Sequence, residues 1–206
     1  MSNKERFTRI TSVFIQPFSK IHLLIVIALL IVPATAMKIV IQRVKSASVS
    51  ISVNQQPTRI SVIGPGILAL VGLHAEDTSS DLEWCAKRLL AVKLWENDSG
   101  SQWRQHVKQK GFEILCVSQF TLYGTLSKKN QPDYKLAMKS VQAEEMYTMF
   151  LGMLKEGYEE NKIQDGKFGE MMDVELVNDG PVTLVIDSRE ELMGSRVSSV
   201  ESLNEA

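Results

Sequence analysis

The sequence predicts a single α/β domain whose sheet is mixed or mostly antiparallel and β-barrel-like, together with two long helices. Three observations support this fold class. Short runs with β-branched residues at alternating positions recur along residues 37–188. Only two longer segments carry apolar residues at helical spacing. Turns between strands outnumber helical crossovers, which argues against a doubly wound nucleotide-binding fold.

Seven segments are expected to form strands. Turn residues separate the second, third and fourth of them, at Asn54–Pro57 and at Gly64–Gly66. The run Ile67–Leu73 is continuously apolar, as expected for a buried strand. The turn Asn178–Pro181 is predicted to join the last two strands. In chain order the expected strands are Met37–Val44, Ala47–Val53, Arg59–Ile63, Ile67–Leu73, Phe112–Leu122, Met171–Val177 and Val182–Asp187.

Two helices complete the predicted domain. Thr78 or Ser79 can cap a helix that continues to about Trp95, and Ala143–Tyr158 forms the second. The polar segment Lys128–Asp133 should be a surface loop. Each helix has one apolar face, made of Leu82, Cys85, Ala86, Leu89, Val92 and Leu94 in the first and of Met146, Met149, Phe150, Met153 and Leu154 in the second.

Residues 1–36 form an amino-terminal hydrophobic extension. Ile21–Val32 is almost wholly apolar and is followed by Ala34-x-Ala36, the small-residue pattern of a signal-peptidase site. The segment Met37-Lys38-Ile39-Val40-Ile41-Gln42-Arg43-Val44 resembles the usual amino terminus of the D-aminoacyl-tRNA deacylase family, starting at its initiator methionine. This resemblance favours an upstream start-site or gene-model artefact, or a minor isoform, for residues 1–36. A true signal or anchor and an organelle-targeting extension remain the alternatives, and only the anchor would involve a membrane. At the other end, residues 189–206 are predicted to be a disordered tail.

Charge and side-chain chemistry restrict the function. The chain has a formal net charge of −1, and residues 1–36 carry +3, so residues 37–206 carry −4 and lack the basic surplus of a typical nucleic-acid binder. Cys85 and Cys116 are expected in the core. His74 and His106 belong to no catalytic triad pattern, so a hydrolase driven by a histidine base is poorly supported. No motif for a metal or a cofactor is present in the sequence.

The first distinctive motif is Ser118-Gln119-Phe120-Thr121-Leu122, at the end of an apolar strand. In the simplest interpretation, these polar groups satisfy the backbone where the strand ends. In the functional interpretation, hydroxyls, an amide and backbone N–H groups hold a carbonyl oxygen as it gains charge during ester hydrolysis. Thr121 is the candidate nucleophile or water positioner. No base is placed near it by the sequence, so oxyanion support and positioning are favoured over covalent catalysis.

The second motif is Asn178-Asp179-Gly180-Pro181-Val182-Thr183. The simplest interpretation is a hairpin turn between strands. In the functional interpretation, a cis Gly180–Pro181 bond aims the two neighbouring carbonyls the same way. Such a rigid acceptor pair would bind an ammonium group in one chirality and exclude the other.

Both motifs, in order, resemble the signatures of the D-aminoacyl-tRNA deacylase family. The resemblance covers about Met37–Asp187 and includes Gln42-Arg43-Val44 and Asp165-Gly166-Lys167-Phe168-Gly169. The intact first motif is similar to that of animal-type members rather than to a paralogous branch in which it is altered. A proline common in the family is replaced around Ser140-Val141, which affects the expected contacts to adenosine.

The resemblance implies a cytoplasmic homodimer that hydrolyses the ester of D-aminoacyl-tRNA, and glycyl-tRNA(Ala) as a further candidate, releasing free tRNA. Family members use no metal or cofactor, and their active site lies at the subunit interface. The roles implied are carbonyl and adenosine contacts for Ser118, Gln119, Phe120 and Thr121, rejection of L-amino acids in the partner's pocket for Gly180 and Pro181, bracing of that turn for Arg43, and pocket formation for Phe168 and Met172.

One alternative of a different class stays open. Some relatives are linked with replication-origin DNA, so the chain could be a non-catalytic, nucleic-acid-associated dimer of the same fold. Binding to duplex DNA requires a basic face, and the charge of −4 on residues 37–206 argues against one.

Overall fold

The computed structural model describes residues 36–189. Apart from Ala36 and Arg189, the predicted amino-terminal extension and the predicted tail lie outside the described residues. Within residues 36–189, no helix is both long and apolar enough to cross a membrane.

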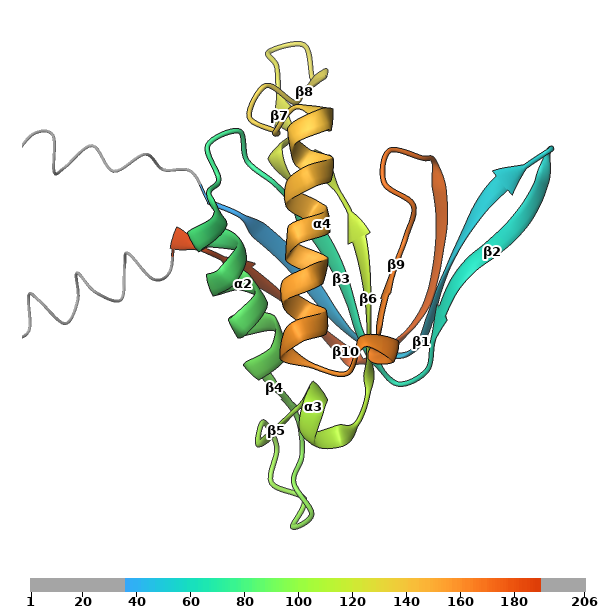
Figure 1. The fold of residues 1–206 in the computed structure, drawn as a ribbon, viewed down its shortest axis with the longest axis vertical. Helices are drawn as coiled ribbons and strands as arrows, with labels where there is room; N and C mark the ends of the chain where they lie inside the picture. The colour runs from blue at the N-terminus through green and yellow to red at the C-terminus, as the bar shows by residue number, and fades with distance from the viewer. Residues whose placement is uncertain (1–35, 190–206) are drawn as a thin grey trace, which may run out of the picture. The chain divides into compact units, whose positions relative to one another are not determined.

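A six-stranded sheet forms the centre of the domain, in the order β10-β1-β3-β6-β9, with β2 paired to β1 (Figure 1). Strands β3, β6 and β9 are parallel neighbours, and all other pairs in the sheet are antiparallel. The predicted mixed, barrel-like sheet is therefore confirmed. The strands are β1 (Lys38–Val53), β2 (Gln56–Ile63), β3 (Gly66–Gly72), β6 (Glu113–Ser118), β9 (Ile163–Asp165) and β10 (Met172–Asp187).

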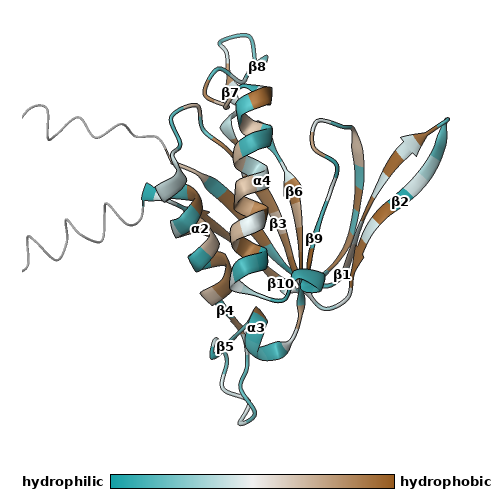
Figure 2. Ribbon diagram, in the orientation of Figure 1, coloured by the Kyte–Doolittle hydropathy of each residue, from teal (hydrophilic) through white to brown (hydrophobic). Residues whose placement is uncertain are grey.

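Helices cover one face of this sheet. The long helices α2 (Ser79–Ala91) and α4 (Ser140–Gly157) pack side by side in front of the strands (Figure 1). Figure 2 shows apolar residues concentrated along the strands behind these helices, whereas polar and apolar residues alternate along the helices themselves. The short elements are β4 (Lys93–Trp95), β5 (Gln105–His106), α3 (Val107–Lys110), η1 (Phe120–Tyr123), β7 (Thr125–Leu126), β8 (Pro132–Asp133) and η2 (Glu160–Lys162).

The central strands β3 and β6 lie between two apolar cores. Successive side chains of a strand point to opposite faces, so Ile67 and Ile114 pack with the helices, whereas Leu68 and Leu115 pack on the other side. The second core is closed by the far half of β1, which reaches it because β1 is irregular between Arg43 and Ser46. The same alternation places Cys116 in the first core. Both cysteines are buried and free, as predicted.

The predicted hairpin turn at Asn178–Pro181 is wrong. Both halves of the segment pair antiparallel with β1 and form the single strand β10. Asn178 is the partner of Val44 and Val182 is the partner of Arg43, so the three residues between them bulge out of the ladder. Proline cannot donate to a ladder, which explains why the interruption falls here.

Other predicted boundaries also differ from the structure. The predicted strands Met37–Val44 and Ala47–Val53 form the single strand β1. Helix α2 ends at Ala91, and Lys93–Trp95 pairs with β5 instead, burying Leu94 at a position that happens to fit the helical period. Helix α4 begins at Ser140, three residues early, because the apolar residue of its first turn, Val141, is exposed and the buried face begins only at Ala143. Strand β6 ends at Ser118 rather than Leu122, and the chain continues as η1.

Two glycines give a matched test of packing. A Cβ on Gly66 would lie 2.0 Å from the carbonyl oxygen of Glu113, its partner in the first pair of the β3–β6 ladder. Gly66→Ala is therefore expected to lower the free energy of unfolding by about 3 kcal/mol, the upper range for overpacking. A Cβ on Gly152 in α4 meets nothing within 4 Å, so Gly152→Ala should raise that energy by about 0.5–1 kcal/mol. Urea unfolding measures both, and equal effects would contradict the packing.

Candidate active site

A pocket of about 610 Å³ opens where β3 and β6 end, next to the amino terminus of α4. Its volume lies in the range of small-molecule sites. Three of the predicted site residues, Ser118, Phe120 and Phe168, line it. The complete lining is Val71, Leu73, Ser118, Phe120, Tyr134, Lys135, Ala137, Met138, Lys139, Ser140, Ala143, Phe168 and Gly169.

The first motif is positioned by the last residue pair of the parallel strands β3 and β6. Ser118 is the register partner of Val71, and the Gln119 N–H donates to the Val71 carbonyl at 2.7 Å. The Leu122 N–H then donates to the Gln119 carbonyl, which turns the chain into η1. Because a helix leaves its first N–H groups without intrahelical partners, those of Phe120 and Thr121 have no hydrogen bond within residues 36–189.

Thr121 is exposed and adjoins the pocket without lining it. The Gln119 side-chain amide donates to Thr121 Oγ1 in a short hydrogen bond. Among the described residues, no histidine, carboxylate or lysine makes a hydrogen bond to Thr121 or Ser118. Thr121 therefore has an amide neighbour that orients its hydroxyl, and no base that would activate it as a nucleophile.

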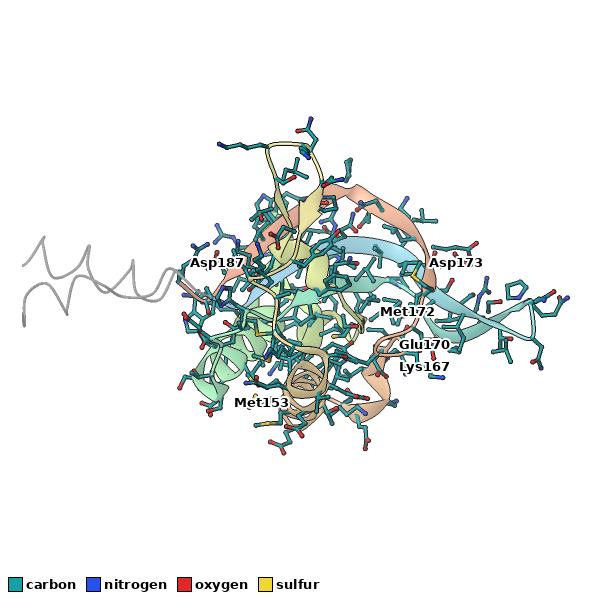
Figure 3. The ribbon with its side chains drawn as sticks, turned by 90° about the horizontal axis from the view of Figure 1, so that it is seen from above. Met153, Lys167, Glu170, Met172, Asp173 and Asp187 are labelled. Atoms are coloured by element: carbon teal, nitrogen blue, oxygen red, sulfur yellow. The ribbon has the colours of Figure 1, made fainter. Side chains whose placement is uncertain are left out.

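Aromatic side chains stand on two sides of the pocket. Phe120 and Tyr134 meet edge to face with ring centroids 4.9 Å apart, and Phe120 is 56% exposed. Phe168 packs against Tyr147, with ring centroids 5.7 Å apart. Met172 does not line the pocket. Its sulfur accepts the Lys167 N–H at 3.3 Å, so it supports the loop that carries Phe168. Figure 3 labels Met172, at the start of β10, near Lys167 and Glu170 of this loop.

The turn His74–Asp77, whose first and last residues are buried, holds the pocket segment after Tyr134. The Met138 N–H donates to the Leu73 carbonyl and the Ala75 N–H to the Leu136 carbonyl, both at 3.0 Å. The turn itself is closed by the His74 N–H, which donates to Asp77 Oδ2 at 2.6 Å. Burial raises the pKa of the Asp77 carboxyl to about 7. Met138 and the neighbouring Lys139 belong to no recognisable motif, so the sequence offered no signal that they line a pocket.

The second motif lies at the other end of the sheet. Arg43 Nε forms an ion pair with Asp179 Oδ2 at 2.9 Å and donates to the Asp179 carbonyl at 3.2 Å, while Arg43 Nη1 donates to the Leu94 carbonyl at 2.5 Å. The Gly180–Pro181 bond is cis, Gly180 has a φ of +123°, and both residues are exposed.

The structure does not bring the two motifs together within one chain. Pro181 lies beside Val182, the partner of Arg43, whereas Ser118 is level with Val71 and Ile39 through the ladder. Along β1, Arg43 and Ile39 are four residues apart, which is about 13 Å. Across the sheet, β10 and β6 are separated by three strand-to-strand spacings, which add to this distance. Gly180 and Pro181 therefore cannot line the pocket of their own chain. Within residues 36–189, no group of three His, Cys, Asp or Glu residues could hold a metal ion.

The chain is similar to several known proteins. A family model described as D-Tyr-tRNA(Tyr) deacylase matches residues 40–187. A Drosophila melanogaster protein named D-aminoacyl-tRNA deacylase is 46% identical over 155 residues, which is 75% of this chain and 94% of that protein. The human D-aminoacyl-tRNA deacylase 1 is 47% identical over 152 residues, which is 74% of this chain and 70% of that protein.

Two solved structures are similar to this one. The first, named c-Myc DNA Unwinding Element Binding Protein, has a TM-score of 0.68 and 45% identity, over 72% of this chain and 97% of that chain. The second is described as a probable eukaryotic D-amino acid tRNA deacylase. It has a TM-score of 0.63 over 74% of this chain and all of that chain, and at 15% identity it shows the fold alone.

The Asp77 turn predicts a pH dependence of stability. Because the folded state keeps a proton that the unfolded chain loses above its pKa of 3.8, Asp77 lowers the free energy of unfolding as the pH rises from about 4 through about 7. Asp77→Asn is therefore expected to gain stability relative to the native protein over that range. Denaturant unfolding at pH 4 and pH 8, with the exposed Asp98→Asn as control, measures the gain. A difference between Asp77→Asn and native protein that does not change with pH would contradict the assignment.

Proposed function

This chain belongs to the D-Tyr-tRNA(Tyr) deacylase family and is a hydrolase of that class, and from this premise we propose how it selects and cleaves its substrate. The proposed reaction is hydrolysis of the ester between a D-amino acid and the 3′ end of tRNA, releasing free tRNA. The observation that carries the proposal is the pocket, which Ser118 and Phe120 of the first motif line.

The first motif offers donors but no activating base, which suits stabilisation of developing charge. The Ser118 hydroxyl and the unpartnered N–H groups of Phe120 and Thr121 would receive the ester carbonyl oxygen as it becomes negative. Gln119 would orient the Thr121 hydroxyl towards the attacking water. The ribose hydroxyl next to the ester would assist the departure of the tRNA. The exposed rings of Phe120 and Tyr134 would contact the terminal adenosine.

The distance between the two motifs supports a site shared by two chains. Strand β10 is an edge strand of the sheet, and its exposed apolar residues are Leu176, Val177, Leu184 and Val185. An exposed apolar edge of this kind favours association with a second copy. We therefore propose a homodimer in which Gly180–Pro181 of one chain completes the pocket of the other.

The same arrangement would supply the chiral filter. Backbone carbonyls around Gly180 would accept the ammonium group of the substrate, and their position would leave no room for the side chain of an L-amino acid. Arg43 would hold them in place through its contacts with Asp179. Glycine has no side chain to exclude, so glycyl-tRNA(Ala) is a further proposed substrate. A cytoplasmic location stays a prediction.

A second candidate function is association with DNA. It is favoured by the name of the 45% identical structure, which refers to a DNA unwinding element. The negative charge of residues 37–206 weighs against a broad contact with duplex DNA. Hydrolysis of D-tyrosyl-tRNA separates the two candidates, because a purely DNA-binding protein would release no amino acid.

Gly180 gives the test of the chiral filter. The native protein should hydrolyse D-tyrosyl-tRNA and leave L-tyrosyl-tRNA intact. A Cβ on Gly180 would lie 2.8 Å from Val182 Cγ2 on a backbone with positive φ, so Gly180→Ala should displace the carbonyls and slow D-ester hydrolysis about 100-fold. Gly100→Ala also introduces a side chain at positive φ, in a loop with nothing within 4 Å, and should retain activity. Equal cleavage of both esters by the native protein would refute the filter, and cleavage of neither would refute the enzyme.

Arg43 gives an independent test. Its guanidinium reaches three acceptors on two segments, which an ammonium group cannot match. Arg43→Lys is expected to reduce the ratio of D-ester to L-ester hydrolysis at least tenfold while the protein remains folded. The matched control is Arg59→Lys, because Arg59 forms a largely exposed ion pair with Glu175. An unchanged ratio in Arg43→Lys would remove Arg43 from the proposed filter.

A further inference from the structure

Positive charge is concentrated beside the pocket. Residues 118–143 contain four lysines and a single acidic residue, Asp133, whereas residues 37–206 as a whole carry −4. We call these four lysines the basic rim: Lys128, Lys129, Lys135 and Lys139. All four are exposed, and two of them, Lys135 and Lys139, line the pocket.

Most of this charge has no compensating carboxylate. Lys135 Nζ pairs with Asp133 at 2.7 Å, and this contact lowers the pKa of the Asp133 carboxyl. Among residues 36–189, no carboxylate lies within 4 Å of Lys128, Lys129 or Lys139. Like charges held together in this way repel each other, so a cluster on an otherwise acidic domain indicates an anionic partner.

The outer half of the basic rim is held by a defined turn. Lys128 and Lys129 lie at the tip of the β7–β8 hairpin, where the Ser127 N–H donates to the Gln131 carbonyl and the Asn130 N–H to the Ser127 carbonyl, both at 2.9 Å. The hairpin begins directly after η1 and Gly124 and ends at Tyr134, so its base is the mouth of the pocket. Its tip lies a few residues away, or about 10 Å along the strands.

The neighbouring rings identify the kind of anion. Proteins bind single-stranded nucleic acid by combining positive charges along its phosphate backbone with exposed aromatic rings that stack on its bases. Phe120 and Tyr134 provide those rings between the pocket and the hairpin. Four lysines on one rim match a few consecutive phosphates, whereas a duplex would require a wider basic face.

We propose that the basic rim binds the phosphates of the single-stranded nucleotides that precede the terminal adenosine of the tRNA. The inference rests on the proposed function for the identity of the RNA. Lysines read charge rather than base identity, so this contact would accept the same 3′ end on tRNAs for different amino acids.

Binding to RNA tests the basic rim without hydrolysis. The probe is a fluorescent RNA hairpin that ends in four unpaired 3′ nucleotides, ACCA, and Kd is measured against NaCl concentration. In the full chain, Lys128→Gln/Lys129→Gln should weaken binding about tenfold and reduce the slope of log Kd against log salt by about 1.4, because each contact with a single strand contributes about 0.7. Lys87→Gln/Lys93→Gln removes the same charge from exposed positions on α2 and β4 and should change neither value.

The same hairpin without its four unpaired nucleotides identifies what the lysines contact. The difference between Lys128→Gln/Lys129→Gln and native protein should vanish with this blunt RNA. A difference of the same size on the blunt RNA, or no difference on the ACCA-ended RNA, would overturn the proposal.

A hydrolysis measurement separates this inference from the proposed function. The ratio of kcat/KM for D-tyrosyl-tRNA to kcat/KM for the D-tyrosyl ester of adenosine should fall about tenfold in Lys128→Gln/Lys129→Gln. An unchanged ratio would overturn the proposed phosphate contact of the basic rim and leave the proposed deacylase activity unaffected. If the native protein cleaved neither ester but bound the ACCA-ended RNA through these lysines, the proposed function would fail while the phosphate contact would stand.

Discussion

The fold depends on the pairing of β1 with three other strands along its whole length. Its first half pairs with β3 on one side and β10 on the other, and its second half exchanges β3 for β2. This is possible because the strand is irregular between Arg43 and Ser46, so that its second half turns across the back of β3 and β6. Both apolar cores follow from that change of direction, since β3 and β6 are buried on two faces only when β1 covers the second one.

The irregularity of β1 also determines where the second motif lies. Residues 179–181 have no partner in the ladder and protrude opposite the bend. Arg43 compensates for the lost ladder bonds by donating to Asp179 and Leu94, and its side chain is only 12% exposed. Buried carbonyls without donors destabilise a protein, so this residue links the stability of the bend to the position of Gly180. The position of the first motif is set at the opposite end of the same sheet, where β3 and β6 end. Rigid strands connect the two ends.

Charge in this protein is arranged locally. The acidic total weighs against a broad nucleic-acid surface, yet the pocket is bordered by lysines and by the amino terminus of α4. A site that contacts only the end of an RNA needs no more positive charge than these lysines carry. Dissolved ions screen the electrostatic field of each exposed lysine beyond about 8–10 Å. Net charge therefore described the average surface and said little about the surface next to the pocket.

The sequence by itself determined the fold class, most of the strands and the two motifs, because β-branched alternation and turn residues act over short distances along the chain. It also indicated that Cys85 and Cys116 are core residues. The tertiary structure decided that Asn178–Val182 is a bulge within one strand, since the partner of each half is a strand more than 120 residues away. It likewise placed Met138 and Lys139 at the pocket, Met172 behind it, and Gly180 at the far end of the sheet. These positions depend on strand register and on the bend of β1, and local sequence patterns carry no information about either.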